Sequence, residues 1–159
     1  MTHHRESHDS IQLTSYHVDR ILEQIKKKPG MEVCGFLAGV GGRVSKVYPV
    51  TNVASNPEVA FYMDPVEQLA ALKDIDKQGL TLLAAYHSHP PGGPEEPSPT
   101  DVALNLDPAL LHLIFVTDTA GNLTSCRAFR LSANSFREIA LILQNASGPV
   151  RNGLDTHVF

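Results

Sequence analysis

The feature that most constrains the fold is the run LTLLAAYHS at residues 80–88. Gly79 precedes this run, apolar residues fill most of it, and a loop rich in Pro and Gly follows it. A short apolar run with such boundaries is typical of a central strand that is buried on both faces of a sheet. Such a strand needs other elements packed over it, so the run predicts the α/β class, with helices packed on a mixed β-sheet.

Further elements are predicted on both sides of this strand. Apolar residues recur at helical spacing from Val18 to Ile25, Gly41-Gly42 separates two apolar runs as a hairpin turn does, and Asp64 has the character of a helix N-cap. We expect helices over 14–27, 64–79 and 132–144, and strands over 32–40, 43–51, 58–64, 80–88, 110–118 and 123–131.

The length of 159 residues suits a single domain. We expect a flexible tail over 1–10, one folded domain over 11–145 and a second tail over 146–159. His3, His4 and His8 lie in the first tail, where a weak metal site is conceivable but a solvated tail is the simpler interpretation.

Composition excludes several classes of function. The net charge is -4 and no basic block occurs, so nothing points to nucleic acid. No apolar run reaches the roughly 18 residues of a membrane span, and the polar N-terminus lacks the apolar core of a signal peptide. We therefore expect a cytoplasmic protein with Cys34 and Cys126 as free thiols. The oligomeric state stays open, a homo-oligomer included.

Two histidines stand at the end of the central strand. Residues i and i+2 of a strand point to the same face, so the imidazoles of His87 and His89 are expected to project together. Neutral imidazole is a good ligand for Zn²⁺. The alternative is a surface HSH at the edge of a loop. Two ligands do not hold a catalytic metal, and Asp101 is the nearest candidate for a third.

The segment Ser98-Pro99-Thr100-Asp101 has the composition of a helix start, with Ser at the N-cap, Pro at N1 and an acid at N3. Taken alone, it predicts a helix cap and no chemistry. Beside the His pair it can also serve a metal site, with Ser98 capping through a lone pair while Asp101 leaves its capping role to bind the metal. The fourth tetrahedral position would then stay open, as in catalytic zinc sites.

These residues resemble the JAMM (MPN+) zinc metalloprotease family. The resemblance rests on Glu32 in the context EVCGFL and on His87, His89, Ser98 and Asp101, and it covers roughly residues 10–145. It implies a JAMM/MPN fold related to that of cytidine deaminases. Eight residues separate His89 from Ser98, one more than the family pattern has, and the loop PGGPEEP can absorb the extra one.

The resemblance also implies the roles of the site residues. His87, His89 and Asp101 would ligate one Zn²⁺ ion, Glu32 would act as general base and then general acid on the attacking water, and Ser98 would help to hold the oxyanion. Spacing alone gives Glu32 no such role, because an acid at the start of an apolar strand is usually an exposed carboxylate. Cys34 and His112, each in an apolar strand, are expected to be core residues.

The substrate implied by the family is a peptide or isopeptide bond after the C-terminal glycine of a ubiquitin-like protein. The segment at 50–69, VTNVASNPEVAFYMDPVEQL, resembles hydrolases that release cysteine from a ubiquitin-like sulfur-carrier protein, a step in cysteine biosynthesis. Removal of ubiquitin-like modifiers from lysine is the alternative, and a non-catalytic MPN scaffold is a further one. A zinc deaminase would require H-x-E and P-C-x-x-C, and neither motif occurs.

Overall fold

The computed structural model describes residues 9–103, 107–145 and 157–158. Its elements follow the chain in the order β1 (Ser10–Thr14), α1 (Ser15–Lys26), β2 (Cys34–Val40), β3 (Arg43–Val50), α2 (Pro65–Lys77), β4 (Thr81–His89), α3 (Pro99–Ala103), β5 (Leu111–Thr117), β6 (Leu123–Ser132), β7 (Ser135–Gln144) and β8 (His157–Val158). Most of both expected tails, including His3, His4 and His8, lies outside the described residues.

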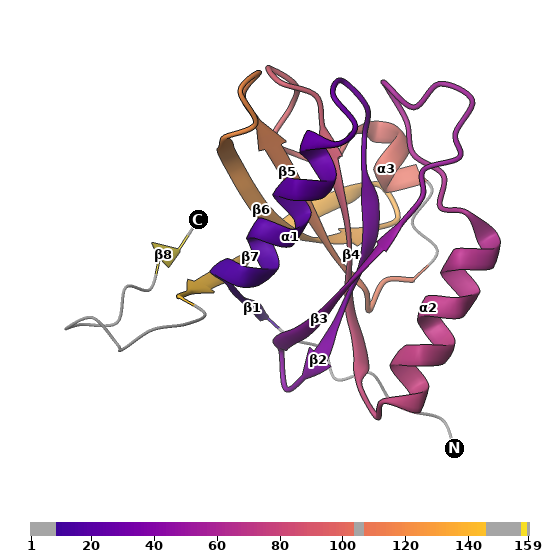
Figure 1. Ribbon diagram of the computed structural model, residues 1–159. Helices are drawn as coiled ribbons and strands as arrows, with labels where there is room; N and C mark the ends of the chain where they lie inside the picture. Colours follow the sequence, from indigo (N-terminus) through magenta and orange to yellow (C-terminus); the bar gives the residue numbers. More distant parts are fainter. Residues whose placement is uncertain (1–8, 104–106, 146–156, 159) are drawn as a thin grey trace.

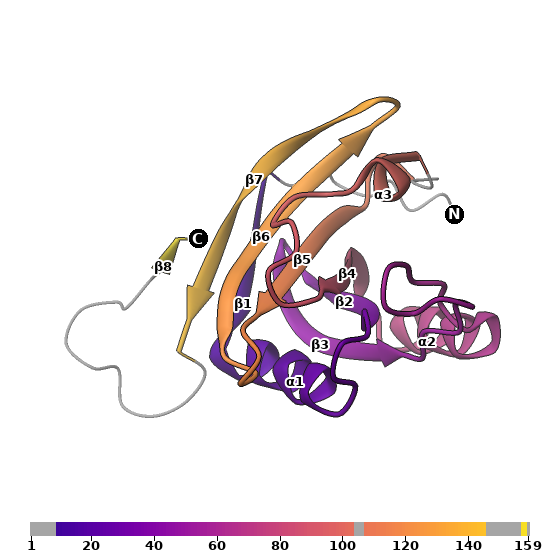
Figure 2. The same ribbon diagram turned by 90° about the horizontal axis from the view of Figure 1, so that it is seen from above.

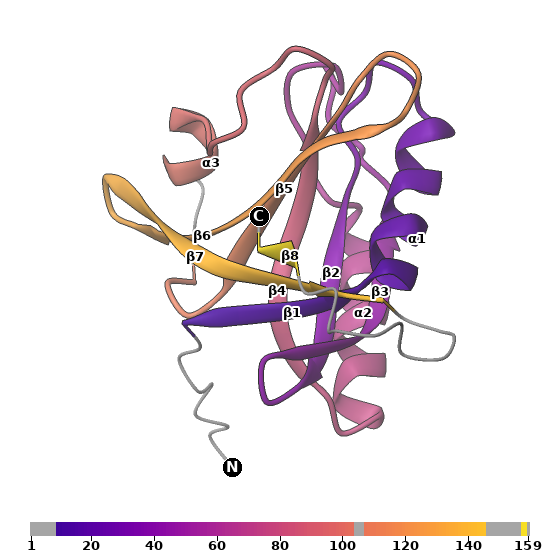
Figure 3. The ribbon, with the colours of Figure 1, turned by 90° about the vertical axis from the view of Figure 1, so that its left-hand side faces the viewer.

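All strands belong to one mixed sheet in the order β1-β3-β2-β4-β5-β6-β7-β8. The predicted central strand β4 is indeed internal, antiparallel to β2 and parallel to β5. Strand β1 pairs in parallel with both β3 and β7, so the sheet closes on itself, and Figure 3 shows β1 running alongside β7. The α/β class with a mixed sheet and packed helices is therefore confirmed.

Helices α1 and α2 cover opposite faces of β2 and β3 (Figure 1). Leu37 of β2 packs in a cluster with Ile21 of α1, while its neighbour Phe36 packs in another with Ile75 of α2. Successive strand residues point to opposite faces, so each cluster occupies one side of the sheet. A third cluster joins Val102 of α3 to β5 and β6, along the side where Figure 2 shows the long β6–β7 hairpin.

The predicted helix over 132–144 is wrong, because these residues complete β6 and form β7. Ile139 and Leu141 are buried while Ala140 between them is exposed, which is the alternation of a strand. Pairing with β6 on one side and β1 on the other satisfies the backbone of this segment. These long-range partners override a local pattern that also fits a helix.

Two other segments differ from the prediction. Residues 58–64 form no strand and keep a single bridge, between Asn52 and Met63, so that 53–62 is a loop that follows β3. Strand β1 was not predicted, although Ile11 and Leu13 in it are buried. Cys34 and Cys126 are buried free thiols, as expected. Within the described part of the chain, no helix has the length and apolar character needed to cross a membrane.

Candidate metal centre

Strand register brings Glu32 to the histidine pair. Cys34 of β2 lies opposite His87 of the antiparallel strand β4. Glu32 lies two residues before Cys34, just ahead of β2, and His89 lies two residues after His87 at the end of β4. The two residues therefore meet on the same face of the sheet, since side chains alternate with a period of two. Glu32, His87 and His89 are 6%, 2% and 6% exposed, so a carboxyl group and two imidazoles share a buried corner.

Asp101 completes a triangle of ligand atoms with the two imidazoles. Nε2 of His87 lies 3.1 Å from Nε2 of His89 and 3.1 Å from Oδ2 of Asp101, and Nε2 of His89 lies 3.4 Å from the same Oδ2. Ligands at about 2.0–2.1 Å from a tetrahedral zinc ion are separated by about 3.3 Å. The three atoms are therefore spaced as the ligands of one metal ion would be.

Glu32 lies beside this triangle and is a second candidate for the third ligand. A ligand oxygen of Glu32 and the ring nitrogens of His87 and His89 lie within 4.8 Å of one another, so these three side chains could also hold a metal. The shorter contacts of Asp101 make it the better partner for the imidazoles. The carboxyl group of Glu32 therefore lies beside the triangle, close to both imidazoles.

Ser98 and Asp101 form a reciprocal cap at the start of α3. The Ser98 amide N–H donates to Oδ2 of Asp101 at 2.8 Å, and the Asp101 amide N–H donates to Oγ of Ser98 at 3.0 Å. The predicted helix start is confirmed. The expectation that Asp101 gives up its capping role is wrong, because a carboxylate oxygen has lone pairs for the cap and for a metal at once.

Electrostatics suit Asp101 and His87 to a cation, whereas His89 must release a proton more readily than it tends to. Burial lowers the pKa of His89, but hydrogen bonds with Asp101 and the Pro94 carbonyl outweigh burial and raise it. Burial opposes ionisation of Asp101, but hydrogen bonds with His87 and His89 outweigh it and hold the pKa of Asp101 below its usual value. Burial lowers the pKa of His87, while its contact with Asp101 works in the opposite direction. An ionised carboxylate beside an imidazole that tends to stay neutral is the protonation state that metal binding requires.

Burial also raises the pKa of Glu32 to about 7. The charge of His89 lowers this pKa and the charge of Asp101 raises it, both by less than burial does. A carboxyl group with a pKa near neutrality can accept a proton and give it back, which is what a general acid–base group needs.

The sequence did not indicate the groups that hold the two histidines. The Nδ1–H of His89 donates to the Pro94 carbonyl at 2.6 Å, which leaves Nε2 free to bind a metal. Phe61 stacks on the His87 ring at 4.5 Å between centroids. Ser88, between the two histidines, accepts a hydrogen bond from the Val33 amide at 2.9 Å and so joins β4 to the residue after Glu32. These contacts depend on tertiary structure and have no local sequence pattern.

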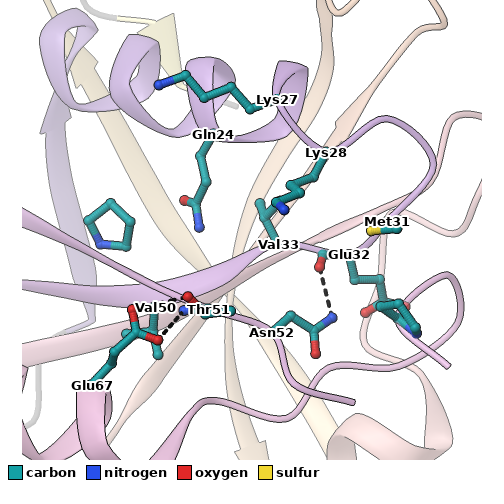
Figure 4. Close-up of a pocket in the computed structure, with 12 residues that line it drawn as sticks. Gln24, Lys27, Lys28, Met31, Glu32, Val33, Val50, Thr51, Asn52 and Glu67 are labelled. Carbon is teal, nitrogen blue, oxygen red and sulfur yellow. Dashed lines mark hydrogen bonds between the residues drawn. The ribbon is translucent and has the colours of Figure 1, made fainter. Parts of the chain in front are cut away.

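Two hollows flank the segment that carries Glu32. One has a volume of about 320 Å³ and lies between α1, the end of β3 and the loop at 51–57, with Glu32 and Asn52 in its wall (Figure 4). The other, of about 500 Å³, lies beside His89, between the end of α1 and the β5–β6 turn. Met31 lines both hollows and is 40% exposed.

Comparison with known proteins agrees with this geometry. The family described as prokaryotic homologs of the JAB domain matches residues 14–132. A desampylase of Haloferax volcanii is 36% identical over 118 residues, which cover 73% of this chain and 81% of the relative. A "Probable TtuB-protein conjugate cleaving protease" of Thermus thermophilus is 40% identical over 100 residues, 63% of this chain and 61% of that protein.

Solved structures show the same fold. A protein of Desulfitobacterium hafniense has a TM-score of 0.75 at 34% identity, with 86% of this chain and 94% of that chain covered. A JAB1/MPN domain protein of Archaeoglobus fulgidus has a TM-score of 0.54 at 17% identity, over 84% of this chain and 97% of that one, and is similar in fold alone. Fold, site and relatives agree: the chain belongs to the prokaryotic JAB (JAMM/MPN) domain family and is a hydrolase of that type.

Proposed function

We propose that this protein is a zinc-dependent hydrolase that cleaves the amide bond after the C-terminal glycine of a ubiquitin-like protein. The observation that carries the proposal is the triangle of His87, His89 and Asp101 beside the buried carboxyl group of Glu32. Three ligands and an open fourth position are the arrangement of catalytic rather than structural zinc sites.

The donor set and its spacing fit zinc, and His87, His89 and Asp101 would hold it. When bound, the ion supplies Lewis acidity, which polarises the scissile carbonyl and makes water acidic enough to deprotonate near neutral pH. The protein supplies the shape of the site. The Pro94 carbonyl and the Phe61 ring hold the two imidazoles in place. The α3 cap aims Asp101 at both of them.

Glu32 is the proposed general base. Its carboxylate takes the proton of the attacking water and later gives it to the leaving amine, a role typically worth about 10²–10⁴ in rate. Ser98 uses a lone pair of Oγ for the α3 cap, so its hydroxyl proton can be donated to the oxyanion that forms at the carbonyl. A positioned donor of this kind contributes about 10²–10³ in rate.

The relatives support a protein conjugate as the substrate. By its name, the Thermus relative cleaves conjugates between TtuB and proteins. We infer that this chain likewise cuts an amide between a ubiquitin-like C-terminus and a lysine of a target protein. Release of cysteine from a sulfur-carrier protein is a second candidate, supported by the resemblance of the segment at 50–69 to hydrolases with that activity. The bond broken is the same type, and only the leaving amine differs.

The test compares Glu32→Gln with the wild type and with the control Glu58→Gln, the same change at an exposed glutamate. Zinc-loaded protein is incubated with a lysine-linked conjugate and, separately, with a carrier–cysteine adduct. We expect Glu32→Gln to keep one zinc per chain and to lose turnover by about 10²-fold or more, because the base is missing. Full activity of Glu32→Gln would remove Glu32 from the mechanism, and inactivity of the wild type on both substrates would refute the proposed function.

A further inference from the structure

Asn52 uses every hydrogen-bonding position of its side-chain amide. Its Nδ2 donates to the Glu32 carbonyl at 2.9 Å and to the Ala60 carbonyl at 3.0 Å. Its Oδ1 accepts the amide N–H groups of Ala54 at 3.0 Å and of Tyr62 at 2.9 Å. The reversed orientation of the amide would set Oδ1 against two carbonyl oxygens, so the network fixes one orientation.

These four bonds join the backbone around the base to the loop at 53–62. The same loop makes a second bond to that backbone, from the Glu32 amide N–H to the Pro57 carbonyl at 2.8 Å. Both backbone polar groups of Glu32 are therefore held by this loop and its first anchor. On the other side, the Val33 amide is fixed to Ser88 at 2.9 Å. The carboxyl group of Glu32 takes its position from this frame.

The far end of the loop reaches a metal ligand. Phe61 lies between Ala60 and Tyr62, the two residues that Asn52 binds there, and its ring stacks on His87 at 4.5 Å with an interplanar angle of 25°. The four hydrogen bonds of Asn52 thus go to backbone groups outside the ligand triangle. They hold the carbonyl of Glu32 at one end and the backbone on both sides of Phe61 at the other.

We propose that Asn52 is a positioning residue that sets the base Glu32 and the Phe61–His87 contact relative to each other through its four hydrogen bonds. The proposal rests on the proposed function, since it assumes that Glu32 acts as the base. A displacement of about 1 Å at a reacting group can lower a rate by about 10²-fold, so loss of the anchor acts on turnover. All four hydrogen bonds of the Asn52 amide go to the protein's own backbone, so their loss is expected to act on kcat rather than on KM.

The experiment compares Asn52→Ala and Asn52→Asp with the control Thr51→Val. Thr51 is the neighbouring residue, and its hydroxyl donates to Glu67 at 3.0 Å on the exposed side towards α2. Asn52→Asp keeps the size of the side chain and the acceptor for Ala54 and Tyr62, and it loses the donor to Glu32. It serves as the second variant if Asn52→Ala does not fold.

For both Asn52 variants we expect kcat to fall by roughly 10- to 100-fold with KM within about twofold of the wild type, and zinc content to stay at one per chain. In Asn52→Ala, hydrogen exchange at the Ala54 and Tyr62 amides accelerates, and the visible absorption of the cobalt-substituted protein changes because the environment of His87 changes. Thr51→Val matches the wild type in the kinetic constants, the zinc content, the amide exchange and the cobalt spectrum.

Unchanged kcat in both variants, or unchanged amide exchange in Asn52→Ala, overturns the positioning role. If the wild type cleaves neither substrate, the proposed function fails by itself. Amide exchange and the cobalt spectrum then decide whether Asn52 holds the loop against the site, because neither measurement depends on turnover.

Discussion

One oxygen of Asp101 both caps a helix and contacts the proposed metal ligand His87. Its Oδ2 accepts the Ser98 amide N–H at 2.8 Å and lies 3.1 Å from Nε2 of His87. The cap holds the carboxylate in place before any ion arrives, so little side-chain entropy is lost on binding. An asparagine at this position could keep the cap while it removes the charge, which allows the two roles to be separated.

Asp101→Asn should therefore weaken zinc binding much more than it weakens the fold. We expect the dissociation constant for zinc to rise by at least about 100-fold, beyond the range typical of residues that only support a ligand. Calorimetric titration with zinc measures this, and thermal unfolding with a chelator measures the cap. Asp64→Asn is the control, because Asp64 caps α2 through the Val66 amide at 3.1 Å. Equal zinc affinity in the wild type and Asp101→Asn would exclude Asp101 as a ligand.

His112 predicts how stability depends on pH. Burial lowers its pKa from 6.5 to about 4, with a further lowering by His87. Between pH 6.5 and about 4, the unfolded chain therefore binds a proton at His112 that the folded protein does not bind. The contribution of His112 to stability is complete above this window and is lost as the pH falls through it. The contribution is on the order of 3 kcal/mol.

Denaturant unfolding of the metal-free protein at several pH values checks this effect against His112→Asn. Removing the titrating group should flatten the loss of unfolding free energy between pH 6.5 and 4 in the variant relative to the wild type. Parallel curves for the two proteins would show that His112 is protonated equally in the folded and unfolded states.

The sequence alone predicted those site residues that lie close together along the chain. His87 and His89 follow from the period of a strand, and Ser98 and Asp101 follow from the composition of a helix start. Glu32 required a family resemblance, because its place depends on the β2–β4 register. Asn52, Ser88 and Phe61 act through tertiary contacts, which no local pattern encodes.

At the scale of elements, local periodicity failed where long-range pairing decides. In a helix over 132–144, Phe136, Ile139, Ala140 and Leu143 would share one apolar face, yet Ala140 is exposed and Leu141 is buried. Helix α2 was correctly predicted, but its apolar residues Val66 and Leu69, three positions apart, are 77% and 53% exposed. Ala71 and Ile75 make the packed side instead.

Substitution of Leu141 or Leu143 by alanine distinguishes strand β7 from the predicted helix over 132–144. Leu141 is 2% exposed, whereas Leu143 is only partly buried at the edge of the same cluster. We expect Leu141→Ala to lower the unfolding free energy by about 2–5 kcal/mol and Leu143→Ala to lower it by clearly less. Urea unfolding measures both, and a larger loss at Leu143 would favour the helical arrangement.

At the scale of the whole molecule, the site is assembled from four segments that are far apart in the sequence. The segment just before β2 brings Glu32, the end of β4 brings the histidines, the start of α3 brings Asp101, and the loop at 53–62 covers His87. The sheet that positions them closes through β1, which pairs with β3 and β7. One hollow lies beside Glu32 and the other beside His89.

The most direct test of the account is X-ray diffraction from crystals grown with zinc, measured on both sides of the zinc absorption edge. The account predicts one strong anomalous peak at about 2.0–2.2 Å from Nε2 of His87, Nε2 of His89 and Oδ2 of Asp101, with solvent at the fourth position near Glu32. Ordered side chains with no anomalous peak between them, or a zinc ion bound elsewhere, would contradict it.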